Sequence, residues 1–250
     1  MGKYLNDLRP SQVEEGGYRK AIIAVGATEG HGPHLPTGTD LYIADGMVED
    51  IASEFSDMLI LPSIPYGVSD NHMMFPYTIS VQPETLIAVL GDVLESLYIR
   101  GIYRVIIING HNGNTAPIEI AGRRAHQKHK EMKIATMPSW WMCAERLLPP
   151  GTLSKENGWH AGEMETAAAM AYFPDLVDLS LAEDCWPRLP FSPLMDMKYT
   201  IDEMSRNGSV GRPSLATAEK GAAIREALKK EAVRYIRALD EMDWNYLVEK

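Results

Sequence analysis

The side chains best suited to chemistry begin in the stretch GATEGHGPHLPTGTD, residues 26–40, whose glycines and prolines disfavour a regular helix. Glu29 and His31 are two residues apart, so an extended backbone would project both toward the same side. Taken alone, His31 could equally be a hydrogen-bonded loop histidine. Asp40 follows at the expected start of a helix, where its carboxylate could act as an N-cap, a ligand or both. Carboxylate and imidazole groups in this arrangement predict a metal site.

A second candidate lies in INGHNGN, residues 108–114, where an apolar run passes directly into asparagine and glycine. His111 would lie at the carboxyl end of a strand, and the flanking glycines would let the backbone approach a ligand closely. The alternative is a phosphate-binding loop, because a glycine-rich turn before a helix can hold an anion. Neither GxGxxG nor GxxxxGKS/T occurs, so we interpret His111 as a metal ligand.

The third candidate is HAGEMET, residues 160–166. On a helix, His160 and Glu163 would share one face, an arrangement suited to converging on one metal ion or one water. Glu165 would then point elsewhere, unless the helix begins later. Glu163 and Glu165 could also be carboxylates of a first helical turn, where the helix dipole favours them.

Five of these side chains could be ligands of a dinuclear metal centre. Two imidazoles and three carboxylates exceed what one catalytic zinc ion uses while keeping an open position. Two ions about 3.5–4 Å apart, bridged by one carboxylate, fit the set better. Mixed imidazole and carboxylate ligation suits Zn, Mn or Fe. The predicted ligands are Glu29, His31, Asp40, His111 and Glu163.

The elements that must position these residues follow an alternating pattern. Apolar runs bounded by turn residues predict buried parallel strands at 21–25, 58–62, 105–108 and 132–137. Apolar residues at helical spacing predict helices at 41–55, 83–97, 116–129, 163–172 and 217–239. The alternation predicts the α/β class, a three-layer α/β/α sandwich with a mostly parallel central sheet. In such folds the sites lie at the carboxyl ends of the strands, where the first two candidate loops fall.

Composition narrows the classes of partner. The 250 residues include 34 acidic and 24 basic side chains, a net charge of −10, which provides no basic surface for nucleic acid or an anionic membrane. Cys143 and Cys185 form no CxxC pair, so neither a thiolate zinc site nor a disulfide framework is indicated. The amino terminus lacks an apolar signal region, and no run approaches the roughly 18 apolar residues of a membrane span. We expect a cytoplasmic protein with one domain over residues 1–250.

Four segments, VGATEGHGPHLPTGTD, INGHNGN, HAGEMET and SVGRPSLATAEKG, together resemble the creatininase family of metal-dependent amidohydrolases. They occur in the family's order between about residues 21 and 221. The resemblance implies a three-layer fold, two divalent metal ions per subunit, and hydrolysis of a C–N amide bond other than an ordinary peptide bond. It also implies a homo-oligomer, usually a hexamer. By motif, Glu29, His31, Asp40 and His111 match metal ligands, with Asp40 as the bridge, and His160 matches a histidine beside the substrate.

One position departs from the pattern of creatininases, in which a glutamate ligand follows the NGH histidine by two residues. Here that position is Gly113. Glu163 is the expected replacement, and Glu165 is the alternative. The departure leaves creatinine open as the substrate, because the family also includes a deformylase of a formamide and a peptidase. A protein that binds a small ligand without catalysis, or one that holds a single structural metal, remains an alternative.

The resemblance also assigns roles around the metals. A hydroxide that bridges them would attack the amide carbon, and His160 would pass a proton to the leaving nitrogen. Glu163 would either bind metal or hold His160. His72, in PYGVSDNHMMFPYTIS, and Trp159 are expected to face the substrate; the alternatives are a surface-loop histidine and a core tryptophan. His34, between two prolines, is expected to support the loop.

Overall fold

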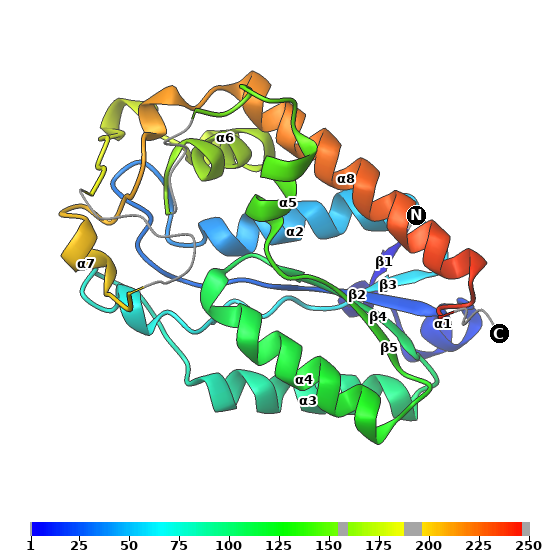
Figure 1. Ribbon diagram of the computed structural model, residues 1–250. Coiled ribbons are helices and arrows are strands. Elements are labelled where there is room, and N and C mark those ends of the chain that lie inside the picture. The colour runs from blue at the N-terminus through cyan, green and yellow to red at the C-terminus, as the bar shows by residue number, and fades with distance from the viewer. Residues whose placement is uncertain (1, 155–159, 188–196, 247–250) are drawn as a thin grey trace.

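Five parallel strands form the central sheet in the residues that the structure, a computed structural model, describes: 2–154, 160–187 and 197–246. The strands lie in the order β1-β3-β2-β4-β5 (Figure 1). Their bounds are β1 Lys3–Tyr4, β2 Lys20–Val25, β3 Met58–Ile60, β4 Arg104–Asn109 and β5 Lys133–Met137. β2 and β4 pair along their whole length, so both end at the same edge of the sheet.

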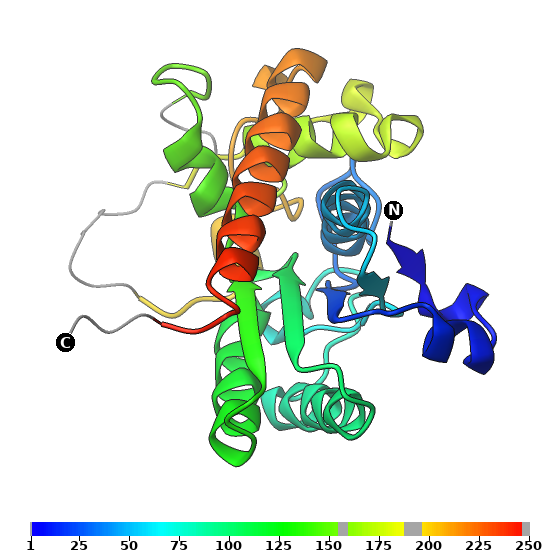
Figure 2. The same ribbon diagram turned by 90° about the vertical axis from the view of Figure 1, so that its right-hand side faces the viewer.

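Helices cover both faces of the sheet (Figure 1 and Figure 2). One face carries α3 (Pro83–Ile99) and α4 (Thr115–Lys128), and the other carries α2 (Thr39–Ala52), α5 (Trp140–Leu147) and α8 (Ala218–Glu241). α6 (Glu163–Tyr172) packs against α2 and α8. The short helices are α1 (Pro10–Glu15) and α7 (Ile201–Met204). Among the residues described, no helix combines the length and apolar character needed to cross a membrane.

The two faces of the sheet bury separate apolar cores because side chains alternate along each strand. On β2, Ile22 belongs to the core that includes Ile43 of α2, whereas Ile23 belongs to the core that includes Leu90 of α3. The near-continuous apolar sequence of β2 is thus the consequence of burial on both faces. The predicted α/β class and three-layer architecture are confirmed, and every strand pair in the described sheet is parallel.

Most predicted elements are present with small shifts at their ends. The helix predicted at 163–172 has the bounds of α6, and the strand predicted at 58–62 ends earlier, at Ile60. α5 was not predicted from the sequence, because it is only eight residues long and therefore gives a short pattern. Trp140, at its start, is fully buried in the core beside α2 and α8.

Candidate metal centre

Four predicted ligands meet beyond the carboxyl ends of β2 and β4. Glu29 and Asp40 are buried, with 0% and 3% of their surfaces exposed. Asp40 Oδ1 lies 3.1 Å from His31 Nε2, and Asp40 Oδ2 lies 3.0 Å from His111 Nδ1. His111 Nδ1 also lies 3.3 Å from Glu29 Oε1. Each oxygen of Asp40 therefore faces a different histidine.

Asp40 lies inside the first turn of α2, and its carboxylate does not cap the helix. The N-cap is Gly38, and the helix begins at Thr39, whose hydroxyl donates to Pro36 O at 2.7 Å. The N-cap interpretation of Asp40 is therefore wrong, because the turn before it starts the helix earlier. Gly110 allows this turn to approach the loop after β4, since a Cβ at that position would lie 2.2 Å from Asp40 O.

Three histidines around the carboxylates share one pattern: one ring nitrogen of each contacts a backbone carbonyl. The contacts are His31 Nδ1 with Glu29 O at 3.2 Å, His111 Nε2 with Val68 O at 2.9 Å, and His160 Nε2 with Gly30 O at 2.8 Å. A carbonyl only accepts, so in a neutral ring these nitrogens carry the hydrogen and the other nitrogen presents a lone pair. The lone pairs face the carboxylates, which is how metal-binding histidines are held.

The carboxylates contain buried acceptors without donors. Neither side-chain oxygen of Glu29, nor Oδ2 of Asp40, accepts a hydrogen bond from the part of the chain that the structure describes. Buried acceptors of this kind are rare and costly in folded proteins. Lone pairs of carboxylates and neutral imidazoles repel one another unless positive charge lies between them. The arrangement therefore fits a divalent cation, and its donors suit Zn, Mn or Fe.

The pKa values of the two carboxylates and of His31 and His111 also indicate that this centre favours positive charge between the carboxylates. Burial disfavours the charged ring of His31, yet the carboxylate of Asp40 outweighs it and raises the pKa of His31 to about 10. Burial likewise opposes charge on His111, but Glu29 and Asp40 hold the pKa of His111 well above its usual range. For Glu29, burial would raise the pKa, and His111 instead lowers it to about 2. In Asp40 burial is again outweighed, chiefly by His31, which holds the pKa of Asp40 well below its usual range.

A second group of possible ligands contains Glu165. Ligand atoms of His31, His160 and Glu165 lie within 4.8 Å of one another. Glu165 Oε2 accepts from Ala161 N at 2.5 Å, and Ala161 adopts φ 47°, a left-handed conformation that is uncommon outside glycine. Burial raises the pKa of Glu165 to about 7. Burial thus disfavours the charged form of the Glu165 carboxylate, and a bound cation would stabilise that form.

Glu163 does not reach this centre. Its Oε1 lies 2.5 Å from Lys220 Nζ, and its Oε2 accepts from Ser154 N at 3.0 Å. α6 begins at Glu163, so His160 precedes the helix and the expected shared helical face does not form. The partner of Glu163, Lys220, lies in the motif SVGRPSLATAEKG. The motif shows that a basic side chain is present but does not indicate which carboxylate it pairs with.

His72 lies closer to the carboxylates than expected for a residue of the substrate pocket. It ends the 3-10 helix Asp70–His72, is buried, and places Nδ1 3.4 Å from Glu29 Oε1. Its ring lies 4.3 Å from that of His160 between centroids. Burial lowers the pKa of His72 to about 4. Trp159, the other predicted pocket residue, lies outside the described residues.

His34 contacts α6 instead of the carboxylates. Its Nε2 lies 2.9 Å from Thr166 Oγ1, so it joins the loop after β2 to the helix that carries Glu165. The structure is consistent in this respect with the expected supporting role.

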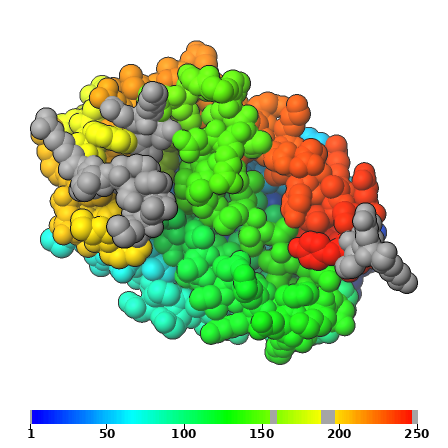
Figure 3. All heavy atoms as spheres, in the orientation of Figure 1, coloured from blue at the N-terminus to red at the C-terminus, as the bar shows by residue number. Residues whose placement is uncertain are grey.

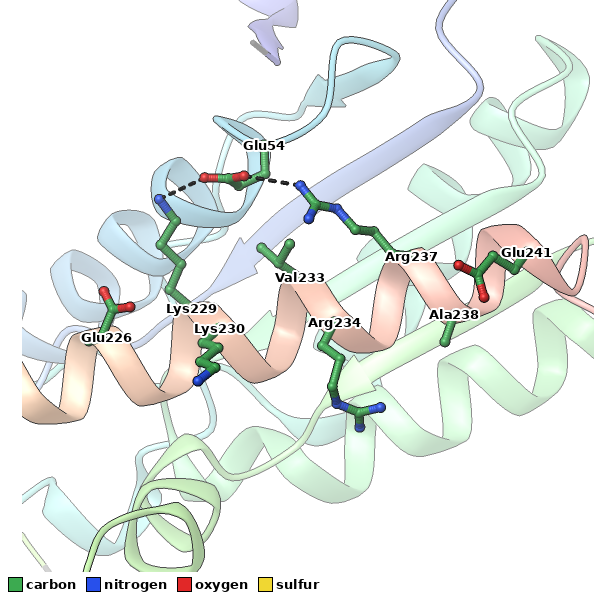
Figure 4. Close-up of a pocket in the computed structure, with 9 residues that line it drawn as sticks. All are labelled: Glu54, Glu226, Lys229, Lys230, Val233, Arg234, Arg237, Ala238 and Glu241. Carbon is green, nitrogen blue, oxygen red and sulfur yellow. Dashed lines mark hydrogen bonds and ion pairs between the residues drawn. The ribbon is translucent and has the colours of Figure 1, made fainter.

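Several hollows on the surface lie elsewhere, and two of them flank α8. One of about 650 Å³ runs along α8 (Figure 4), where Glu54 pairs with Lys229 Nζ at 3.0 Å and with Arg237 Nη2 at 3.1 Å. Its acidic and basic groups thus partly neutralise one another. Another of about 170 Å³ lies between β5, α5 and α8, on the face shown in Figure 3. Neither hollow includes a residue of the buried centre, so the centre remains the candidate site.

Comparison of the sequence with known families and proteins identifies its relatives. A family model described as creatinine amidohydrolase matches residues 6–236. The chain is 29% identical over 210 residues to the mycofactocin precursor peptide peptidase of Mycolicibacterium smegmatis, covering 81% of this chain and 78% of that protein. It is 28% identical to the creatinine amidohydrolase of Pseudomonas putida, covering 82% and 84%. It is also 28% identical to the 3-dehydro-scyllo-inosose hydrolase of Thermotoga maritima, covering 88% and 77%.

Solved structures give the same fold. A creatininase structure described as the Mn form superposes with a TM-score of 0.80 at 25% identity, covering 95% of this chain and 98% of that chain. A mutant creatininase of the Zn-Zn type superposes with a TM-score of 0.79 at 25% identity and the same coverage. Both descriptions name metals that suit imidazole and carboxylate ligands.

Proposed function

The chain belongs to the creatininase family, and we propose that it is a metal-dependent hydrolase that cleaves a C–N amide bond in a small molecule. The observation that carries the proposal is the set of buried carboxylate oxygens without donors, enclosed by histidines whose outer nitrogens face backbone carbonyls. Such an arrangement holds lone pairs in place for a cation and has no evident purpose in a purely structural core.

In this proposal two divalent ions, Zn, Mn or Fe, bind at the centre. Glu29, His31, Asp40 and His111 would hold the ions, and Asp40 would be shared between them because its two oxygens face His31 and His111 separately. Glu165 takes the place of the carboxylate that Gly113 cannot supply, since its oxygens lie near His31 and His160. When bound, such ions polarise the amide oxygen and activate water as a nucleophile at neutral pH.

His160 is the proposed proton carrier. Its Nε2 faces Gly30 O, which leaves Nδ1 free on the side of the carboxylates, 3.7 Å from Glu29 Oε1. Burial, helped by His31 and His72, holds the pKa of His160 well below its usual range. A neutral imidazole at this place can accept a proton at Nδ1 from the attacking water and return it to the leaving nitrogen. His72, whose ring packs beside that of His160, is proposed to limit the space for the substrate.

The substrate is proposed to be a small amide, with creatinine as one candidate. Relatives of similar identity are named for different substrates, the mycofactocin precursor peptide and 3-dehydro-scyllo-inosose among them. A formamide or a short peptide is therefore the alternative within this family. We further propose a homo-oligomer, which the family resemblance implies.

The test combines metal analysis with an activity screen. Protein purified without chelator should contain close to two equivalents of Zn, Mn or Fe per chain. After reconstitution it should hydrolyse at least one substrate among creatinine, formamides and short peptides, and chelation should abolish that activity. Protein without metal that still binds a small ligand would instead identify a binding protein. One equivalent whose removal unfolds the chain would identify a structural metal.

A further inference from the structure

The backbone of Val68 connects three loops at the proposed metal centre. Val68 O accepts from His111 Nε2 at 2.9 Å, and Val68 N donates to Asn114 Oδ1 at 2.9 Å. Asn114 Nδ2 in turn donates to Gly26 O at 2.9 Å. The loops after β2, β3 and β4 are therefore joined through one fully buried side chain, that of Asn114.

We propose that Asn114 is a positioning residue of the metal centre: through Val68 it fixes the tautomer and the direction of the His111 ligand. This inference rests on the proposed function. The proton on His111 Nε2 is held by the Val68 carbonyl, and that carbonyl keeps its place because the amide of the same residue is bound by Asn114. With the outer nitrogen held, His111 Nδ1 points at Glu29 and Asp40.

The position of Asn114 argues against a purely local role. Asn114 is the N-cap residue of α4, where asparagine ordinarily accepts hydrogen bonds from the first turn of the helix. Its side chain makes no such bond and instead reaches Val68 and Gly26. The side chain of Asn114 therefore does not cap the helix and instead joins loops that carry the proposed ligands.

Gly113 lies against the same contact between Val68 and His111. A Cβ at this position would lie 2.0 Å from Val68 O and 2.8 Å from His111 Nε2. The Val68 carbonyl therefore occupies the space that a side chain at position 113 would need. A glutamate there, as in creatininases, would require Val68 to move away and His111 to lose its acceptor. Gly113 lacks the carboxylate that a glutamate would offer to a metal ion. The contact between Val68 O and His111, which orients the His111 ligand, requires a glycine at this position.

The experiment compares Asn114→Ala with Asn112→Ala, a change of an exposed side chain in the same loop. Metal affinity is measured by competition with a chromophoric chelator, and thermal unfolding is recorded for metal-free and metal-loaded protein. Asn114→Ala should weaken binding of at least one metal equivalent by about 10–100-fold, as is typical when a group that orients a ligand is removed. Asn112→Ala should leave the affinity unchanged.

Two further variants keep the inference falsifiable if Asn114→Ala folds poorly. Asn114→Asp retains an acceptor for Val68 N and should recover most of the affinity, whereas Gly113→Ala should lower it by displacing the Val68 carbonyl. Unchanged metal affinity in folded Asn114→Ala, or in Gly113→Ala, would overturn the inference and leave Asn114 a purely structural residue. Wild-type protein that binds no metal would overturn the proposed function itself, a result distinguishable from either.

Discussion

Buried charged side chains lie near both ends of β2, and they differ in whether their partners are present in the protein. At the amino end, Lys20 is 2% exposed, and its Nζ contacts Asp57 Oδ2 at 3.0 Å and Asp240 Oδ2 at 2.7 Å. Beyond the carboxyl end, Glu29 and Asp40 present buried oxygens that accept no hydrogen bond from the described residues. A buried charge whose partners are all present has a structural explanation, whereas one without them indicates a missing ligand.

The strongest test of this contrast is Asp40→Asn at the carboxyl end. An amide cannot bridge two cations as a carboxylate does, so we expect metal affinity to fall by more than the roughly 10–100-fold typical of supporting groups. Activity should become undetectable. Metal-free protein should be less stable than wild type at neutral pH, because the substitution removes the charge that faces His31 and His111.

Metal content by elemental analysis and unfolding in urea provide the measurements. Asp45→Asn, on the same helix, is the matched control, since Asp45 accepts from the Ser63 hydroxyl and lies outside the centre. Full metal content with full activity in Asp40→Asn would refute the bridging assignment.

His160→Ala separates proton transfer from metal binding. Loss of a proton carrier typically lowers kcat by about 10²–10⁴-fold, and we expect this range with both metal equivalents retained. Steady-state kinetics on the reconstituted variant measure it, and His129→Ala, which removes a histidine that pairs with Glu95 far along the chain, serves as the control. If His160→Ala instead loses one metal equivalent, His160 is a ligand.

Glu165→Gln and Glu163→Gln form a pair that tests which glutamate completes the centre. Glu165→Gln should lower the metal content toward one equivalent, because Glu165 lies with His31 and His160. Glu163→Gln should keep two equivalents and lower the free energy of unfolding by about 1–3 kcal/mol, because it weakens the ion pair with Lys220. The reverse pattern of metal contents would restore Glu163 as the ligand.

The sequence predicted what depends on the order of strands and loops. Parallel strands end at one edge of the sheet, so Glu29 and His111, which follow two apolar runs, could be expected to meet. His111 Nδ1 lies 3.3 Å from Glu29 Oε1. The choice between Glu163 and Glu165 could not be made in this way, because it depends on where α6 begins. The left-handed turn at Ala161 and the start of α6 at Glu163 bring Glu165 near His31 and His160, and neither has a clear sequence signal.

Contacts between distant segments were also beyond prediction. Asn114 is conspicuous in INGHNGN, yet nothing in the sequence indicates that it binds the backbone of Val68. Lys20 directly precedes the apolar run of β2, but its partner Asp240 lies near the end of α8. Such contacts between residues far apart in the sequence depend on how the helices pack on the sheet, so they can be identified only in the three-dimensional structure.

The smallest predicted effect is at the amino end of β2. Lys20→Met keeps the apolar stem and removes the ammonium group, leaving Asp57 and Asp240 without their shared partner. The side chains of these carboxylates are 19% and 28% exposed, so water can solvate them in part. We expect the free energy of unfolding at neutral pH to fall by about 1–3 kcal/mol, less than for a fully buried pair. Metal content and activity of the folded protein should stay unchanged, which is the opposite of Asp40→Asn.

The pH dependence of the same variant sharpens the comparison. Burial would raise the pKa of Asp57, but Lys20 outweighs it and lowers the pKa below its ordinary value. A depressed carboxyl pKa contributes stability above the unfolded pKa, which is about 4, and loses it as pH falls through the folded pKa. The difference between metal-free wild type and Lys20→Met, measured by urea unfolding, should therefore narrow as pH falls from about 5 to 3. A difference that stays constant over this range would contradict a role for the ion pair with Asp57 and would favour the contact of Lys20 Nζ with the Phe55 ring, whose centroid lies 5.2 Å away.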